Sequence, residues 1–222
     1  MTSTTSEHSD PSTVTVNGTG SATAAPDIAR VSIGISVTYP AVADAFDALA
    51  RHSTTLTETL RAHDIRGVDL VTTGLSVHPQ TQWVDGGRSE TTGFTASTTF
   101  RVVVRDLDPS SATSPASLIA ACISAAGDAI RLDSLEFDLE DRTELAERAR
   151  ETAWAAARSK AVHLAGLAQK NLVDTLEISE GVDQMIPVRG VFAAARADSA
   201  PLAVEHGEIE ETISIRVRWS MA

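Results

Sequence analysis

The amino-acid sequence predicts an α+β fold made of two β-α-β-β units, with mostly antiparallel sheets covered by helices and one further helix that connects the units. Segments with an apolar residue at every second position, typical of half-buried strands, recur along the chain. Other segments carry apolar residues at helical spacing. The order strand, helix, strand, strand over residues 29–105 is repeated over residues 132–219. Strands with one wetter face are typical of antiparallel pairing.

The first unit follows a short strand at residues 14–16, which runs into Gly18-Thr19-Gly20, a pattern that predicts a glycine turn or bulge between two strand segments. The helix of this unit has apolar residues stepping by three or four, at Val42, Phe46, Leu49, Leu56 and Leu60. The following strand is expected to place Val71, Leu75 and Val77 on one side. The expected elements are a strand at 29–39, a helix at 41–63, a strand at 69–78, a hairpin loop at 79–92 and a strand at 94–105.

The connecting helix is predicted to begin near Pro115 and to end at Gly127, with Cys122 on its apolar side as a buried small hydrophobe. The longest helix has a mostly small stripe, which lets its axis lie close to what it covers. That stripe consists of Ala146, Ala149, Ala153, Ala157, Leu164 and Ala168. The elements expected here are a strand at 135–139, a helix at 141–169 and strands at 172–179 and 209–219. Residues 13–222 are expected to form a single domain, and residues 1–12, rich in Ser and Thr, a disordered tail.

Composition and charge exclude several classes of partner. The 222 residues include 30 acidic and 18 basic ones, a formal charge of −12, and no dense run of Lys and Arg. Nucleic acid is therefore not an expected partner, because phosphate binding needs concentrated positive charge. No stretch of roughly 20 predominantly apolar residues predicts membrane insertion. The first residues lack the pattern of a secretory signal, so a cytoplasmic location is expected.

Motifs that carry chemistry are not evident. The single cysteine excludes an intrachain disulfide and a multi-cysteine metal site, and the six histidines lack metal-ligand spacing. Gly74-Leu75-Ser76-Val77-His78 departs from the nucleophile elbow in its last residue and lies in a strand pattern. The sequence therefore predicts no catalytic residue, no cofactor and no metal site.

The stretch from Asp183 to His206 lacks sustained periodicity but contains large apolar side chains. Such side chains are poor choices for a freely solvated linker, so they either fold back on their own domain or meet another chain. The expected oligomer contact loop contains Met185, Ile186, Val188, Val191 and Phe192.

Several strings, in order along the chain, resemble the SIMPL-domain family, which is named for a kinase-interacting signalling protein and is widespread in bacteria. They are Val14-Thr15-Val16-Asn17-Gly18-Thr19-Gly20, Thr72-Thr73-Gly74-Leu75-Ser76-Val77-His78-Pro79-Gln80, Gly93-Phe94-Thr95-Ala96-Ser97, Val102-Val103-Val104-Arg105-Asp106-Leu107 and Leu176-Glu177-Ile178-Ser179-Glu180-Gly181. The resemblance implies a bacterial member with an α+β fold and no established catalytic residues. It also implies a tendency, seen in some members, to form ring-like or channel-like homo-oligomers, and relatives are often exported.

Two functional hypotheses remain. The first is a non-enzymatic oligomeric assembly or protein-interaction module, with further copies of the same chain as the expected partner. The second is a small-ligand-binding protein or enzyme whose site is composed by the tertiary structure near the central hairpin, for instance around His78, Gln80 and Arg101.

Overall fold

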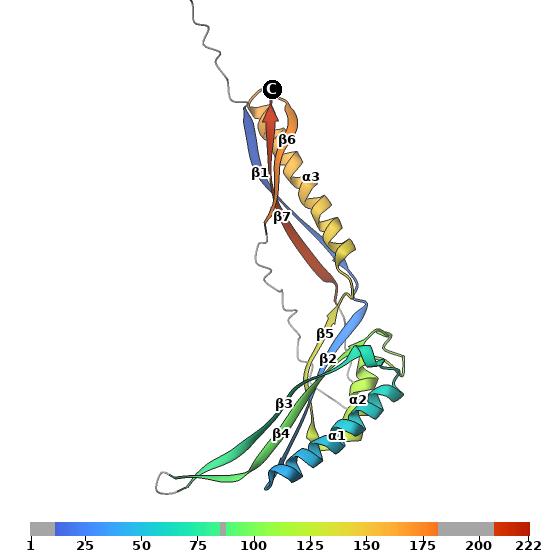
Figure 1. Cartoon of the computed structure of the whole chain (residues 1–222). Helices are drawn as coiled ribbons and strands as arrows, with labels where there is room; N and C mark the ends of the chain where they lie inside the picture. Colours follow the sequence, from blue (N-terminus) through green and yellow to red (C-terminus); the bar gives the residue numbers. More distant parts are fainter. Residues whose placement is uncertain (1–11, 85–87, 182–206) are drawn as a thin grey trace, which may run out of the picture. The chain divides into compact units, whose positions relative to one another are not determined.

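The computed structural model describes residues 12–84, 88–181 and 207–222. Helices pack on two antiparallel sheets, which confirms the α+β class (Figure 1). The chain divides into two compact units, called here the four-stranded unit and the three-stranded unit after their sheets. The expected tail at 1–12, apart from residue 12, and the expected contact loop lie outside the described residues.

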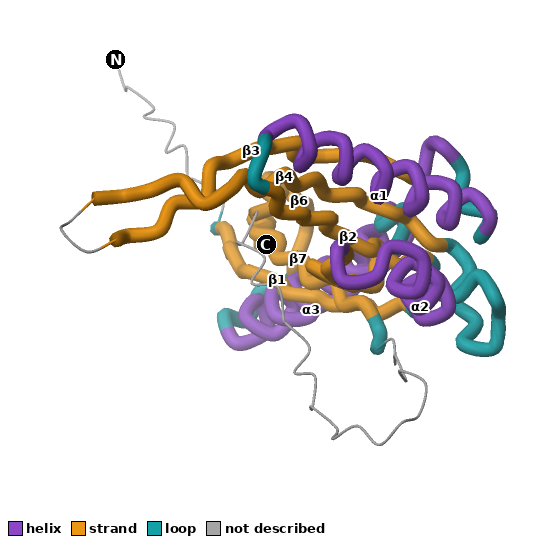
Figure 2. Tube along the Cα trace, turned by 90° about the horizontal axis from the view of Figure 1, so that it is seen from below, coloured by secondary structure: helices purple, strands orange, loops and turns teal. Residues whose placement is uncertain are grey.

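The four-stranded unit has the strand order β3-β4-β2-β5, and every neighbouring pair is antiparallel. Two helices pack on this sheet (Figure 2). The end of the β3–β4 hairpin continues beyond the last pair between β2 and β4, Tyr39 with Phe94. The elements are β2 (Ile28–Tyr39), α1 (Val42–Ala62), β3 (Leu70–Val84), β4 (Arg88–Val104), α2 (Pro115–Ala126) and β5 (Ile130–Asp138).

Local sequence explains the ends of these helices. Pro115 occupies the first turn of α2, where its missing N–H costs nothing, and the Ser114 hydroxyl accepts from the Ser117 N–H. Gly127 follows the helix with a φ of 57°, a conformation that glycine adopts without strain. The core between helices and sheet is aliphatic and includes Ile33, Leu56, Leu60, Val102 and Leu118.

The three-stranded unit has the order β1-β7-β6, again antiparallel throughout. Its single helix packs mainly on β1 and β7 (Figure 1). Trp154 of this helix contacts Trp219 of β7, with 5.7 Å between ring centroids. The elements are β1 (Thr13–Ala24), α3 (Thr143–Leu167), β6 (Leu172–Gly181) and β7 (Ile209–Met221).

The predicted order of strand, helix, strand, strand occurs twice, as β2-α1-β3-β4 and as β5-α3-β6-β7. The structure also shows which strands are neighbours, and the alternating sequence pattern cannot predict this. Strand β5 pairs with β2, and strand β1 pairs with β7, so the sheets contain four and three strands. An alternating pattern identifies a half-buried strand but not its neighbour, because any strand edge can supply the hydrogen bonds.

The prediction of a turn or bulge at Gly18 and Gly20 is wrong. Both glycines lie within β1, in continuous register with Ile215 and Ile213 of β7. A Cβ atom on Gly18 would lie 2.1 Å from the backbone oxygen of Ala153, and one on Gly20 would lie 2.1 Å from the backbone nitrogen of the same residue. The two glycines are therefore required by the close approach of α3 to the sheet, not by a change of chain direction.

The predicted small stripe of α3 packs on the sheet at Ala146, Ala149, Ala153 and Ala157, but it is wrong at its C-terminal end, where Leu164 and Ala168 are exposed. Leu164 is exposed and Ala146 is half-buried. The buried row steps by four residues throughout, through Leu145, Ala149, Ala153, Ala157, Ala161 and Ala165. Each step of four rotates the row by about 40° around the helix, so the row can follow a twisted sheet, whereas steps averaging 3.6 residues would run straight along the axis.

Candidate functional site

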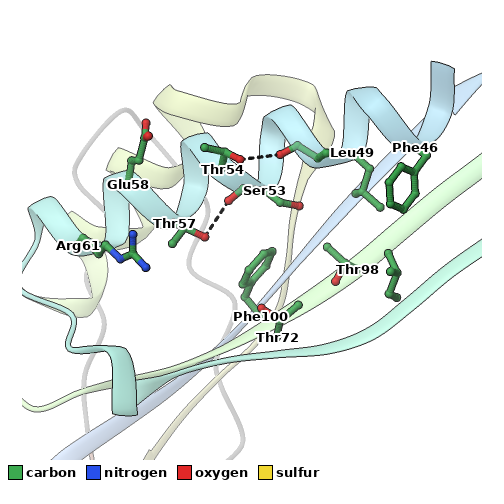
Figure 3. Close-up of a pocket in the computed structure, with 12 residues that line it drawn as sticks. Phe46, Leu49, Ser53, Thr54, Thr57, Glu58, Arg61, Thr72, Thr98 and Phe100 are labelled. Carbon is green, nitrogen blue, oxygen red and sulfur yellow. Dashed lines mark hydrogen bonds between the residues drawn. The ribbon is translucent and has the colours of Figure 1, made fainter. Parts of the chain in front are cut away.

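A groove of about 450 Å³ lies between α1 and strands β3 and β4 in the four-stranded unit (Figure 3). It exists because α1 packs on β2 and β4, while β3 forms the uncovered edge of the sheet. The apolar part of the lining comes from Phe46 and Leu49 on the helix, from Leu75 on β3 and from Phe100 on β4.

A β-bulge shapes one wall of this groove. Thr73 pairs with Thr99 and Ser76 pairs with Ser97, so Gly74 and Leu75 together face the single residue Thr98. Gly74 has a φ of 66°, the left-handed conformation that a bulge of this kind needs at its first position. The extra residue contributes Leu75 to the groove, where it remains 61% exposed.

The bulge also corrects the predicted face of β3. Val71 pairs with Arg101, whose side chain lies on the exposed face of the sheet, while Val77 pairs with the buried Ala96. Val71 and Val77 therefore lie on opposite faces, although the alternation placed them together. One inserted residue shifts the period-two pattern by one position, which exchanges the faces of all later residues.

Thr98 lies opposite the bulge and lines the groove. Only 4% of this residue is exposed, and its hydroxyl has no hydrogen-bond partner in the described part of the chain. A buried hydroxyl without a partner costs roughly 1–3 kcal/mol. Such a group is a site where a bound molecule can contribute a hydrogen bond that the protein itself lacks.

The positive charge in the groove comes from Arg61, near the C-terminal end of α1. The Arg61 side chain points into the space between the helix and the strands, whereas Glu58 points away from the strands (Figure 3). Among the ion pairs of the described residues, none involves Arg61. The groove thus combines apolar side chains, several Ser and Thr side chains, Glu58, the buried Thr98 hydroxyl and one accessible guanidinium.

The structure does not bring together His78, Gln80 and Arg101. His78 pairs with Thr95, and Arg101 lies six residues further along β4, or about 20 Å at the usual strand rise. All three side chains are exposed, and none of them lines the groove. The hairpin named in the second hypothesis contributes residues of β3 and β4 to the groove, but His78, Gln80 and Arg101 are not among them.

A protein-family model described as SIMPL, a protein of unknown function (DUF541), matches residues 14–219. The chain belongs to the SIMPL family. The match extends over elements of both units, from β1 to β7. No curated protein matches the chain.

This SIMPL-family chain keeps its one thiol out of reach of solvent. Cys122 is 1% exposed in the core of the four-stranded unit, as predicted, and burial raises its pKa to about 11. Protonated and buried, it is an inert packing residue. Across residues 12–84, 88–181 and 207–222, no group of three or more His, Cys, Asp or Glu could hold a metal ion. None of the helices in these ranges is long and apolar enough to cross a membrane.

A buried carboxylate stands at the start of β3. Asp69 accepts from Arg66 at 2.7 Å, and its other oxygen lies 2.6 Å from an Arg105 nitrogen. Burial acts to raise the pKa of Asp69, but the hydrogen bonds from the two guanidinium groups outweigh it and hold the pKa below its ordinary value of 3.8. Arg105 also bonds Glu140, so the cluster fixes the loop before β3 to the end of β4 and the end of β5.

Replacing Asp69 by Asn is expected to lower the free energy of unfolding at pH 7 by roughly 1–2 kcal/mol. This is less than the ~3–5 kcal/mol typical of a broken, fully buried pair, because Arg66 and Arg105 remain partly in water. A pKa depressed by folding stabilises above the ordinary value and ceases to do so as the pH falls through the folded value. Urea titrations should therefore show a difference between wild type and Asp69→Asn at pH 7 that shrinks below about pH 4. A difference that stays constant down to pH 2 would contradict this assignment.

Proposed function

We propose that the protein is a non-enzymatic assembly module that associates with further copies of itself through strand β6. The observation that carries this proposal is the exposure of β6. Within the described part of the chain, β6 is an edge strand paired only with β7, and nine of its ten residues are exposed. An edge strand presents unpaired N–H and C=O groups, which can pair with a strand of another molecule.

The side chains of β6 favour association. Val173, Leu176 and Ile178 are all exposed, and Ile178 is 58% exposed although it pairs with the buried Val217. The reason is that α3 lies over β1 and β7 and leaves β6 almost uncovered. Apolar side chains at an unprotected edge gain from burial in an interface.

The charges of β6 are compatible with a second strand beside it. Glu177 lies 3.5 Å from Arg218, and Glu180 lies 3.0 Å from Arg150. These arginines offset carboxylates that would otherwise repel the same carboxylates on a symmetry-related copy. Pairing of β6 with β6 of another copy is the two-fold arrangement that homo-oligomers most often use.

The double substitution Leu176→Lys and Ile178→Lys is expected to reduce the assembly. Lysines at a strand edge oppose pairing by charge and by loss of apolar burial. Light scattering after gel filtration should show an oligomer for the wild type and a lower mass for the variant at the same concentration. The control is Val68→Lys, the same kind of change at a residue that is 80% exposed in the four-stranded unit.

A wild-type chain that stays monomeric at high concentration contradicts the proposal, as does a double variant that keeps the wild-type mass. A second variant tests the expected contact loop separately. If Met185, Ile186, Val188, Val191 and Phe192 are also part of the interface, changing all five to Ser lowers the mass as well.

A further inference from the structure

The groove of the four-stranded unit has the size and composition of a small-molecule site. Its volume of about 450 Å³ lies within the range of roughly 300–1,000 Å³ that such sites usually occupy. The exposed surface of its walls is mainly apolar, although seven of its twelve lining residues carry polar or charged groups. This composition favours a ligand with an apolar body.

Two large apolar side chains on opposite sides of the groove are largely exposed. Phe46 on α1 is 48% exposed, and Leu75 on the bulge is exposed to a similar degree. The exposure of these two side chains is not what the local sequence pattern predicts. The helical spacing of α1 assigns Phe46 to the buried side, and a bulge inserts Leu75 into the wall. Bulges are enriched next to binding sites, where they redirect a side chain.

The Thr54 and Thr57 hydroxyls donate to backbone oxygens of α1. Among the other polar lining residues, Arg61 and Thr98 stand at separate points of the groove. Arg61 stands at one end of the groove, about 22 Å along the helix from Phe46 at 1.5 Å per residue. Phe100 lies between Arg61 and Thr98 (Figure 3). A guanidinium without an ion pair matches a carboxylate by two parallel hydrogen bonds, and the unpartnered hydroxyl of Thr98 matches an oxygen remote from that carboxylate.

We propose that this groove binds an amphipathic monocarboxylate whose apolar chain carries a hydroxyl or keto oxygen at a distance from the carboxylate, such as a hydroxylated medium-chain fatty acid. The carboxylate lies on Arg61. The chain covers Phe100 and reaches Phe46 and Leu75, and its oxygen bonds the Thr98 hydroxyl. Glu58 also lines the groove, but its carboxylate points away from the strands (Figure 3).

Calorimetric titration of the full chain, below micelle-forming concentrations, tests the proposal with four compounds. These are ω-hydroxydodecanoate, dodecanoate without the hydroxyl, dodecanol without the carboxylate, and sodium acetate without the long chain. Saturable binding is expected to be tightest for ω-hydroxydodecanoate and to weaken for each compound that lacks a group. Acetate should show no binding, because the apolar walls supply most of the affinity.

Two variants with matched controls assign the contacts. Arg61→Gln should weaken ω-hydroxydodecanoate about tenfold or more and leave dodecanol unchanged, whereas Arg51→Gln on the exposed, non-lining side of α1 should change nothing. Thr98→Val has nearly the same shape. It should weaken ω-hydroxydodecanoate several-fold, leave dodecanoate unchanged, and raise the urea midpoint of the free protein, because a buried unpaired hydroxyl is removed.

The proposal is overturned if no compound binds saturably, or if Arg61→Gln and Arg51→Gln behave alike. It is also overturned if Phe46→Ala lowers the mass of the oligomer without affecting the titrations, because the groove would then be a contact between copies. These outcomes are independent of β6, which belongs to the other unit.

Discussion

The variant Gly20→Ala should lose at least 3 kcal/mol of unfolding free energy, the largest effect that we expect from any single methyl group in this chain. The added Cβ would lie 2.1 Å from the backbone nitrogen and 2.6 Å from a backbone oxygen of α3, those of Ala153 and Ala149. Overpacking usually costs about 1–3 kcal/mol when flexible side chains can yield. Here the obstacle is backbone, so the helix itself must move away from the sheet.

Tryptophan fluorescence during urea unfolding measures this loss of stability in the three-stranded unit. Trp154 of α3 packs against Trp219 of β7, so the emission of this pair reports the contact between the helix and the sheet. Trp83 of β3 is already 77% exposed, so its emission changes little on unfolding. The control is Gly166→Ala in the last turn of the same helix, where a Cβ meets nothing within 4 Å. That change should be neutral or stabilise by up to about 1 kcal/mol. Equal urea midpoints for wild type and Gly20→Ala would contradict the close packing of α3 on β1.

Gly18 and Gly20 illustrate what local sequence patterns cannot predict. Periodicity located the strands and helices well, because alternation and helical spacing arise from one element and one buried face. Gly18 and Gly20 were assigned to a turn, since glycine most often marks a turn and since the helix that needs them begins more than a hundred residues later. The small residues of α3 were noticed, but nothing local linked them to these glycines.

The groove between α1 and the strands could not be predicted from the sequence for a related reason. Gly74 resembles part of a nucleophile motif, whereas an isolated glycine within a strand pattern also signals a bulge. Without the bulge, Leu75 stays in line with Val71 and no extra side chain enters the wall. The orphan hydroxyl of Thr98 depends on its neighbours in three dimensions and leaves no trace in the spacing of residues.

The sequence predicts no metal site and no catalytic motif, but such predictions depend on residues that lie close together in the chain. The candidate groove instead collects its polar groups from α1 and β4, with Arg61 and Thr98 separated by 37 positions in the printed sequence. Such a combination can be recognised only after the strands are paired. Spacing along the chain therefore indicates neither Arg61 nor Thr98, and it names His78 and Arg101, which lie apart on the hairpin.

A comparison of Leu56→Ala with Phe46→Ala tests the boundary between core and groove on α1. Helical spacing predicted both side chains on one buried stripe, but Leu56 is fully buried and Phe46 is about half exposed. Removing Leu56 leaves a cavity in the core and should cost about 3 kcal/mol. Removing Phe46 takes away only part of the burial of one aromatic ring and should cost about 1 kcal/mol or less, although Phe→Ala in a core costs roughly 3–5 kcal/mol.

Amide hydrogen exchange in β2 and β4 provides the measurement, because these strands carry the core of the four-stranded unit while the tryptophans of the other unit would not report it. The protection of both strands should fall strongly in Leu56→Ala and only slightly in Phe46→Ala. An equal loss in the two variants would mean that Phe46 is a core residue and that the groove has no free aromatic wall. A small loss in Phe46→Ala would mean that this side chain contributes little to the stability of the fold. An open groove between α1 and β3 needs an aromatic side chain of this kind, which is free to contact a ligand.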